Sequence, residues 1–259
     1  MLLAILTILA YLSALLWIMP TIVKVDYSGK PNVKAVFLIG LVAVLLHFFN
    51  LSQQVWQGEG QNITVTNIVS LMSLMMSTFA TFALPKWRTI WHPLSVLYVL
   101  GIVSVALSSF VSGNFIKHLE EDSGLLFHLA IAVFSYGLFF IALLYAFQLK
   151  WLDKKLKSKN MVFCTLFPPL MTVERHFFAL TLSGQVLLSI ALITGMIYLH
   201  NFFAPEQVHK AVFSFMAWIV YAIQLLGQWK LHWRGKRVLI YSISGMILLT
   251  IGYFGSRVV

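Results

Sequence analysis

The stretch that decides the fold is EEDSGLLFHLAIAVFSYGLFFIALLYAFQLK, which runs from Glu120 to Lys150. Within it, the residues from Leu125 to Leu149 carry no formal charge. A helix rises ~1.5 Å per residue, so a segment of this length crosses the ~30 Å hydrocarbon core of a bilayer. Acidic residues precede the segment and basic residues follow it, which by the positive-inside rule places its N-terminal end outside the cytoplasm. The stretch therefore predicts a transmembrane helix with a defined orientation.

The composition of the whole chain is typical of a membrane protein. The 259 residues are 60% hydrophobic and only 10% charged, and the mean hydropathy is +0.88. Soluble domains carry about 25% charged residues. The formal net charge of +10 does not indicate nucleic-acid binding, because the basic residues occupy short loops between apolar segments. The single Cys164 excludes a disulfide within the chain and a C-x-x-C redox pair.

Apolar segments repeat along the rest of the chain, and no soluble domain separates them. We therefore predict an all-α polytopic membrane protein, a bundle of eight transmembrane helices that forms a single transmembrane domain over residues 1–259. The longest connection, residues 150–176, is predicted to be cytoplasmic. The predicted spans are Leu2–Met19, Ala35–Leu51, Ile63–Leu84, Pro93–Val111, Leu125–Leu149, Phe177–Leu199, Ala211–Gln228 and Val238–Phe254.

The distribution of basic residues predicts the orientation of the bundle. Fifteen of the 18 Lys and Arg residues lie in the first, third, fifth and seventh connections. The positive-inside rule places these connections in the cytoplasm and both termini on the opposite side of the membrane. The chain is apolar from Leu2 and has neither a basic leader region nor a small-residue cleavage site, which favours a retained span over a signal peptide.

The histidines are the candidate chemical groups. An ionisable side chain within a membrane span is uncommon and indicates function by default. Imidazole near a helix end can bind a haem iron, bind another metal or carry a proton. The predicted topology gathers five of the eight histidines at the outer side of the membrane: His47, His118, His128, His200 and His209.

A structural interpretation stays open beside the functional one for each of these side chains. His118 and His209 lie in predicted loops, where contact with water or lipid headgroups is favoured. His128 lies within a long apolar span, where function is favoured. At His47 and His200, polar neighbours make a structural contact and metal ligation equally well supported.

Several classes of enzyme and transporter are poorly supported. The chain has no Gly-rich phosphate loop before a helix, no H-E-x-x-H and no G-x-S-x-G motif. The predicted spans contain no carboxylate, which weakens the hypothesis of a proton-coupled transporter. We therefore predict no catalytic residues and no enzymatic activity.

Five sequence elements, in order and on matching spans, carry a resemblance to a known family. They are His47, NIVSL at 67–71, HLAIAVFSY at 128–136, PPL at 168–170 with ER at 174–175, and WRGKR at 233–237. Together they resemble the cytochrome c assembly family of membrane haem handlers, of the CcsA/CcmC type. The resemblance covers most of the chain, and it is closer to a branch of inner-membrane proteins of Gram-negative bacteria.

The resemblance implies a multi-pass protein of the bacterial inner membrane with periplasmic termini, which handles haem in cytochrome c biogenesis. It implies haem b held at the periplasmic side, with His128 as an axial ligand and His47 or His200 as the second. His118 and Lys210 would meet the haem propionates or the iron. The implied partners are the lipid bilayer, haem and other cytochrome c maturation or membrane proteins, with no nucleic acid.

The chain departs from the family pattern in the interval from His200 to Lys210. Haem-handling members carry the tryptophan-rich WWD motif there, whereas this chain reads HNFFAPEQVHK. In the seventh span, Gln224 and Gln228 stand where an inner histidine ligand is expected. Two alternatives therefore stay open: a non-haem scaffold or interaction protein descended from the family, and a small-molecule or ion transporter.

Overall fold

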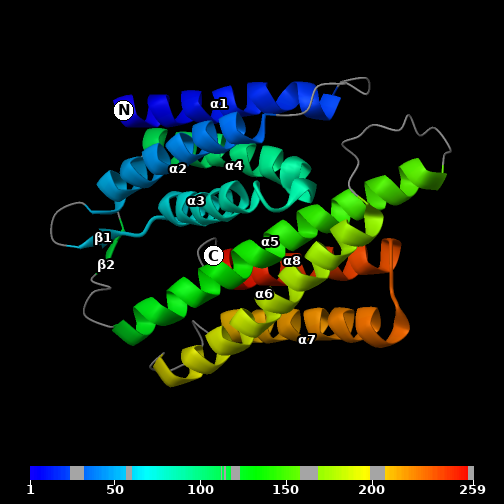
Figure 1. Cartoon of the computed structure of the whole chain (residues 1–259). Helices are drawn as coiled ribbons and strands as arrows, with labels where there is room; N and C mark the ends of the chain where they lie inside the picture. Colours follow the sequence, from blue (N-terminus) through cyan, green and yellow to red (C-terminus); the bar gives the residue numbers. More distant parts are fainter. Residues whose placement is uncertain are drawn as a thin grey trace. The chain divides into compact units, whose positions relative to one another are not determined.

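The computed structural model describes residues 1–23, 32–56, 60–111, 113, 115–117, 123–157, 169–198 and 208–255. In this part of the chain, eight helices are long and apolar enough to cross a membrane, which confirms the predicted all-α class (Figure 1). The helices are α1 (Leu2–Val23), α2 (Val33–Val55), α3 (Val65–Ala83), α4 (Trp91–Phe110), α5 (Ser123–Lys157), α6 (Leu170–Tyr198), α7 (Val208–Leu231) and α8 (Lys236–Phe254). A short 3-10 helix, η1 (Arg88–Ile90), precedes α4, and two strands, β1 (Gln61–Asn62) and β2 (Ile116–Lys117), complete the fold. The periplasmic location of both termini stays a prediction.

The chain divides into two compact units. Unit 1 comprises Met1–Leu119 and Asn160–Pro168 and contains α1 to α4; unit 2 comprises Glu120–Lys159 and Pro169–Val259 and contains α5 to α8. Each unit is a bundle of four helices and is treated by itself below. The single transmembrane domain over residues 1–259 stays a prediction.

Hydroxyl side chains occupy the interior of unit 1. A stripe on α3 is buried although it is polar, and its members are Asn67, Ser70, Ser73, Ser77 and Thr81. Small hydroxyl residues permit close helix contact in a membrane and satisfy their own polar groups on nearby carbonyls. Thr81 donates to the carbonyl of Ser77 at 2.7 Å, for example, and Ser73 is hydrogen-bonded to Ser104 of α4. The stripe therefore forms part of the packing surface of α3.

A small sheet closes one end of unit 1. Strand β1 pairs with β2 in antiparallel register, with Gln61 opposite Lys117 and Asn62 opposite Ile116. The Asn62 side chain accepts a hydrogen bond from the Phe115 N–H at 3.0 Å and donates to the Gly113 carbonyl at 3.1 Å. We call this the sheet end of unit 1.

Helix α2 continues beyond its predicted end at Leu51 as far as Val55. The reason is that its polar last turns have partners on α4: Asn50 and Gln54 both donate to the Ser109 hydroxyl, at 3.3 and 2.7 Å. His47 is consequently about two turns from the end of the helix instead of one.

Helix α5 is also longer than its apolar segment. It has 35 residues and ends at Lys157, beyond the predicted end at Leu149. Lysine and leucine favour helix, and Lys157 forms an i,i+4 ion pair with Asp153 at 2.8 Å. At ~1.5 Å per residue the helix is about 52 Å long, so it exceeds the ~30 Å hydrocarbon core. Helix α6 likewise begins at Leu170, before the predicted start at Phe177.

Aromatic rings and glycines meet in the core of unit 2. Phe139 of α5 stacks on Tyr221 of α7, with ring centroids 3.7 Å apart. Gly184 of α6 lies against the Phe139 ring, and Gly245 of α8 lies against the Tyr221 ring. The absence of a side chain at these two positions lets four helices converge on one aromatic pair.

Candidate functional site

His128 lies near the N-terminal end of α5 and is half-buried in unit 2. Its Nδ1 atom is 3.2 Å from Thr194 Oγ1 on α6. The Thr194 hydroxyl donates its own hydrogen to the Ile190 carbonyl at 2.8 Å, so its oxygen accepts from His128 Nδ1–H. With the hydroxyl hydrogen placed on the Ile190 carbonyl, this contact corresponds to the tautomer in which Nε2 carries a lone pair. That tautomer is the one that binds a metal through Nε2 while the other nitrogen is held in place.

Ser135 and Tyr136, at the end of the element HLAIAVFSY that begins with His128, have partners deeper in unit 2. Ser135 donates to the Gly184 carbonyl of α6 at 3.0 Å. Tyr136 forms a hydrogen bond with Thr250 of α8 at 3.2 Å. These contacts fix the rotation of α5 and therefore the direction in which its first turns present their side chains.

His47 is completely buried in unit 1, with no exposed side-chain surface. Its Nδ1 is 3.1 Å from the Tyr11 hydroxyl of α1, and its Nε2 is 2.9 Å from the Ser70 hydroxyl of α3. Either tautomer satisfies both contacts, because a hydroxyl donates or accepts. A metal can reach this imidazole only if one of the two hydrogen bonds breaks.

The contacts of His47 continue into a larger polar cluster. The Tyr11 ring is 5.2 Å from that of Tyr98, and the Ser77 carbonyl accepts from Thr81 at 2.7 Å. Tyr98 in turn is 2.9 Å from the Thr81 hydroxyl. We call Tyr11, His47, Ser70, Ser77, Thr81 and Tyr98 the His47 cluster; all four helices of unit 1 contribute to it.

The His47 cluster predicts a measurable loss of stability when one contact is deleted. We expect Ser70→Ala to lower the free energy of unfolding by about 1 kcal/mol, because His47 Nε2 then lacks its partner in an apolar interior. Denaturant titration of the purified protein in detergent measures this change. Ser13→Ala is the control, since that hydroxyl contacts only the Ala10 carbonyl of its own helix and is exposed. Equal stabilities of the two variants would contradict the assignment.

The other predicted site residues are placed only in part. His118 and His200 lie outside the described residues. Lys210 is partly buried in the first turn of α7, where its backbone carbonyl lies close to Gly252 of α8. Gln224, at the position of the expected inner ligand, is buried and donates to the Ser242 hydroxyl at 3.1 Å. His47 and His128 belong to different units, so the structure does not bring the predicted ligands together within one bundle.

Three hydroxyl partners were missed by the sequence analysis: Thr194, Tyr11 and Ser70. Their separations from the histidine that each contacts are 66, 36 and 23 residues. No local sequence pattern links positions so far apart. Only Ser70 was recognisable in the sequence as a buried polar side chain, because it belongs to the polar stripe of α3. Within the described residues, no group of three or more His, Cys, Asp or Glu side chains could hold a metal ion.

Eight helices that are long and apolar enough to cross a membrane, with a buried His47 and a half-buried His128, define a multi-pass α-helical membrane protein. Residues 35–259 match the family described as Cytochrome C assembly protein, and the chain belongs to this family. The predicted family is thereby confirmed. Helix α1, which supplies Tyr11 to the His47 cluster, lies before the matched region.

Relatives of known location are similar over nearly the whole chain. The inner membrane protein YpjD of Escherichia coli K12 is 37% identical over 258 residues, which are 99% of this chain and 97% of the relative. The proteins of the same name from Escherichia coli O6:H1 and O157:H7 match to the same extent. With its eight membrane-crossing helices, the chain is a multi-pass protein of the bacterial inner membrane, as predicted. No solved structure matches significantly.

Proposed function

We propose that this chain binds haem b at the periplasmic side of the inner membrane, in or near cytochrome c maturation, with His128 as an axial ligand through Nε2. The observation that carries the proposal is the contact of His128 Nδ1 with Thr194, whose hydroxyl donates to the Ile190 carbonyl. A ligating imidazole is commonly oriented in this way by a partner on its other nitrogen. Membership of the cytochrome c assembly family supports haem as the ligand.

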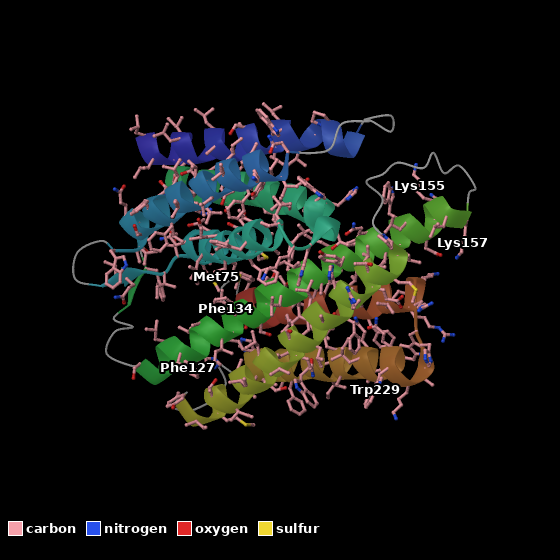
Figure 2. All side chains as sticks on the ribbon, viewed as in Figure 1. Met75, Phe127, Phe134, Lys155, Lys157 and Trp229 are labelled. Carbon is pink, nitrogen blue, oxygen red and sulfur yellow. The ribbon has the colours of Figure 1, made fainter. Side chains whose placement is uncertain are left out.

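Exposed aromatic side chains of α5 support the choice of an apolar, planar ligand near His128. Phe127 and Phe134 are seven residues apart on α5, so they lie on one helix face, and both are exposed (Figure 2). These rings lie roughly 100–120° around α5 from His128, so they offer apolar surface on the helix face next to the one that carries the imidazole. The haem would supply an iron centre, while His128 would hold it and Thr194 would keep the imidazole in one orientation.

The two candidates for the second ligand are not equal. His47 does not fit as it lies in the structure, because both ring nitrogens are hydrogen-bonded and the side chain is fully buried. His200 follows Thr194 by six residues in the sequence, and Thr194 contacts His128. We therefore assign the second position to His200 and a structural role to His47. Lys210, at the start of α7, would pair with a haem propionate.

A spectroscopic titration tests the proposal. The protein is purified in detergent, titrated with haemin and compared with detergent micelles alone. We expect a Soret band that saturates at one haem per chain and a shift of that band on reduction with dithionite. A wild-type protein with no band beyond that of the micelles would overturn the proposal and favour the alternative of a non-haem scaffold. No side chain in this proposal makes or breaks a covalent bond, so no enzymatic activity is proposed.

A further inference from the structure

The end of unit 2 opposite His128 carries a dense positive charge. It is formed by the last turns of α5 and α7, the first turns of α6 and α8, and the turn between α7 and α8. Nine exposed basic side chains of the described residues lie there, and we call them the basic end of unit 2: Lys150, Lys154, Lys155, Lys157, Arg175, Lys230, Arg234, Lys236 and Arg237. Against these nine stand two carboxylates of the same segments, Asp153 and Glu174, which leaves a net charge of +7.

Both carboxylates are already engaged by basic side chains. Asp153 is paired with Lys157, and Glu174 accepts a hydrogen bond from Arg234 Nε, each at 2.8 Å. The basic end of unit 2 therefore keeps a net positive charge, which attracts anions.

Two tryptophans hold lysines at the ends of their helices. Lys155 Nζ lies 5.8 Å from the ring centroid of Trp151 on α5, and Lys230 Nζ lies 4.7 Å from that of Trp229 on α7. Trp229 is 68% exposed (Figure 2). Exposed tryptophan at the end of a membrane span settles at the depth of the lipid headgroups. A lysine held over such a ring is thereby kept near the level of the headgroup phosphates.

The turn between α7 and α8 is rigidly attached to its own unit. The ring of Trp233 stacks on that of Tyr241, with centroids 5.1 Å apart. The backbone N–H of Trp233 donates to the Gly227 carbonyl at 3.1 Å. Gly227 has no side chain, which leaves room for the indole. Together with the ion pair between Arg234 and Glu174, these contacts present the basic side chains from a fixed scaffold.

We propose that the basic end of unit 2 binds the phosphate headgroups of anionic phospholipids, such as phosphatidylglycerol. Phospholipid is favoured over a soluble polyanion because exposed apolar side chains alternate with the lysines. Leu156, Trp229 and Leu231 are all exposed beside them, and such side chains match the glycerol and acyl region of a lipid. The proposal is independent of haem binding and concerns the opposite end of unit 2.

Spin-labelled lipids test this proposal in the whole protein. The chain is reconstituted in phosphatidylcholine bilayers with trace spin-labelled phosphatidylglycerol or phosphatidylcholine, and the motionally restricted fraction gives the relative association constant. We expect wild type to prefer phosphatidylglycerol, with a preference that falls as salt rises. A triple variant, Lys154→Gln with Lys155→Gln and Lys230→Gln, is expected to reduce that preference at least about fivefold, since each basic residue at an anionic surface contributes roughly that factor at low salt.

The control removes the same charge from unit 1. Lys34→Gln with Lys86→Gln and Lys117→Gln takes away three lysines of unit 1 and is expected to leave the preference near that of wild type. Substitution of Lys154, Lys155 and Lys230 by arginine is expected to preserve the preference for phosphatidylglycerol as well. An equal loss in the control, an unchanged glutamine variant or a wild type without preference would overturn the proposal. The last result would direct attention to an acidic soluble partner.

Discussion

Replacement of His128 by alanine is expected to remove the Soret band from protein reconstituted with haem. Among the described residues of the proposed site, the imidazole of His128 is the iron ligand, because Nδ1 contacts Thr194 and Nε2 is the nitrogen proposed to bind. Without it, the proposed site would keep only His200, Lys210 and apolar contact with residues such as Phe127. The absorption spectrum after removal of unbound haem measures this loss directly.

Two further variants separate ligation from a general loss of structure. His92→Ala removes another half-buried histidine, in unit 1, and is expected to leave the Soret band unchanged. Thr194→Val keeps the shape of the side chain but cannot accept from His128 Nδ1–H, so it should weaken haem binding by roughly 10- to 100-fold and move the band. A His128→Ala protein with an undiminished band would show that another residue binds the iron.

The Gly245→Ala variant of α8 is expected to lower the free energy of unfolding of unit 2. A methyl group at this position would lie 2.6 Å from Tyr221 Cε2. The Tyr221 ring cannot give way, because it is buried and stacked on Phe139 at 3.7 Å. Overpacking of this kind costs about 1–3 kcal/mol.

The comparison with a second glycine of the same chain makes the result interpretable. Gly255→Ala, at the end of α8, places its methyl group 3.3 Å from the flexible side chain of Ile251 only. Gly245 lies inside α8, where the higher helix propensity of alanine offsets about 1 kcal/mol of the overpacking cost, whereas Gly255 is the C-cap of the helix and gains less. Denaturant unfolding in detergent should therefore show Gly245→Ala to be less stable than Gly255→Ala by up to about 2 kcal/mol. Equal stabilities would mean that the aromatic pair is not the rigid centre of unit 2.

The ends of the helices were the least accurate part of the sequence analysis. Hydropathy reports how much of a helix lies in hydrocarbon, whereas a helix ends where its backbone hydrogen bonds end. Helix α5 therefore runs on through charged residues to Lys157, and α2 runs on through Asn50 and Gln54 because Ser109 pairs with both. Neither extension leaves a signal in the apolar pattern itself.

The sequence alone determined the class, the eight spans and the family, because the length of an apolar segment, its flanking charges and its short motifs are local properties. It also singled out His128, where function was favoured, and His47, where a structural contact and ligation were equally supported. Only the tertiary structure decided the partners of each: it brings Thr194 to one nitrogen of His128, and it brings Tyr11 and Ser70 to both nitrogens of His47. The physical reason is that the availability of an imidazole nitrogen depends on hydrogen-bond partners from other helices, and packing alone decides which of these come within 3.2 Å.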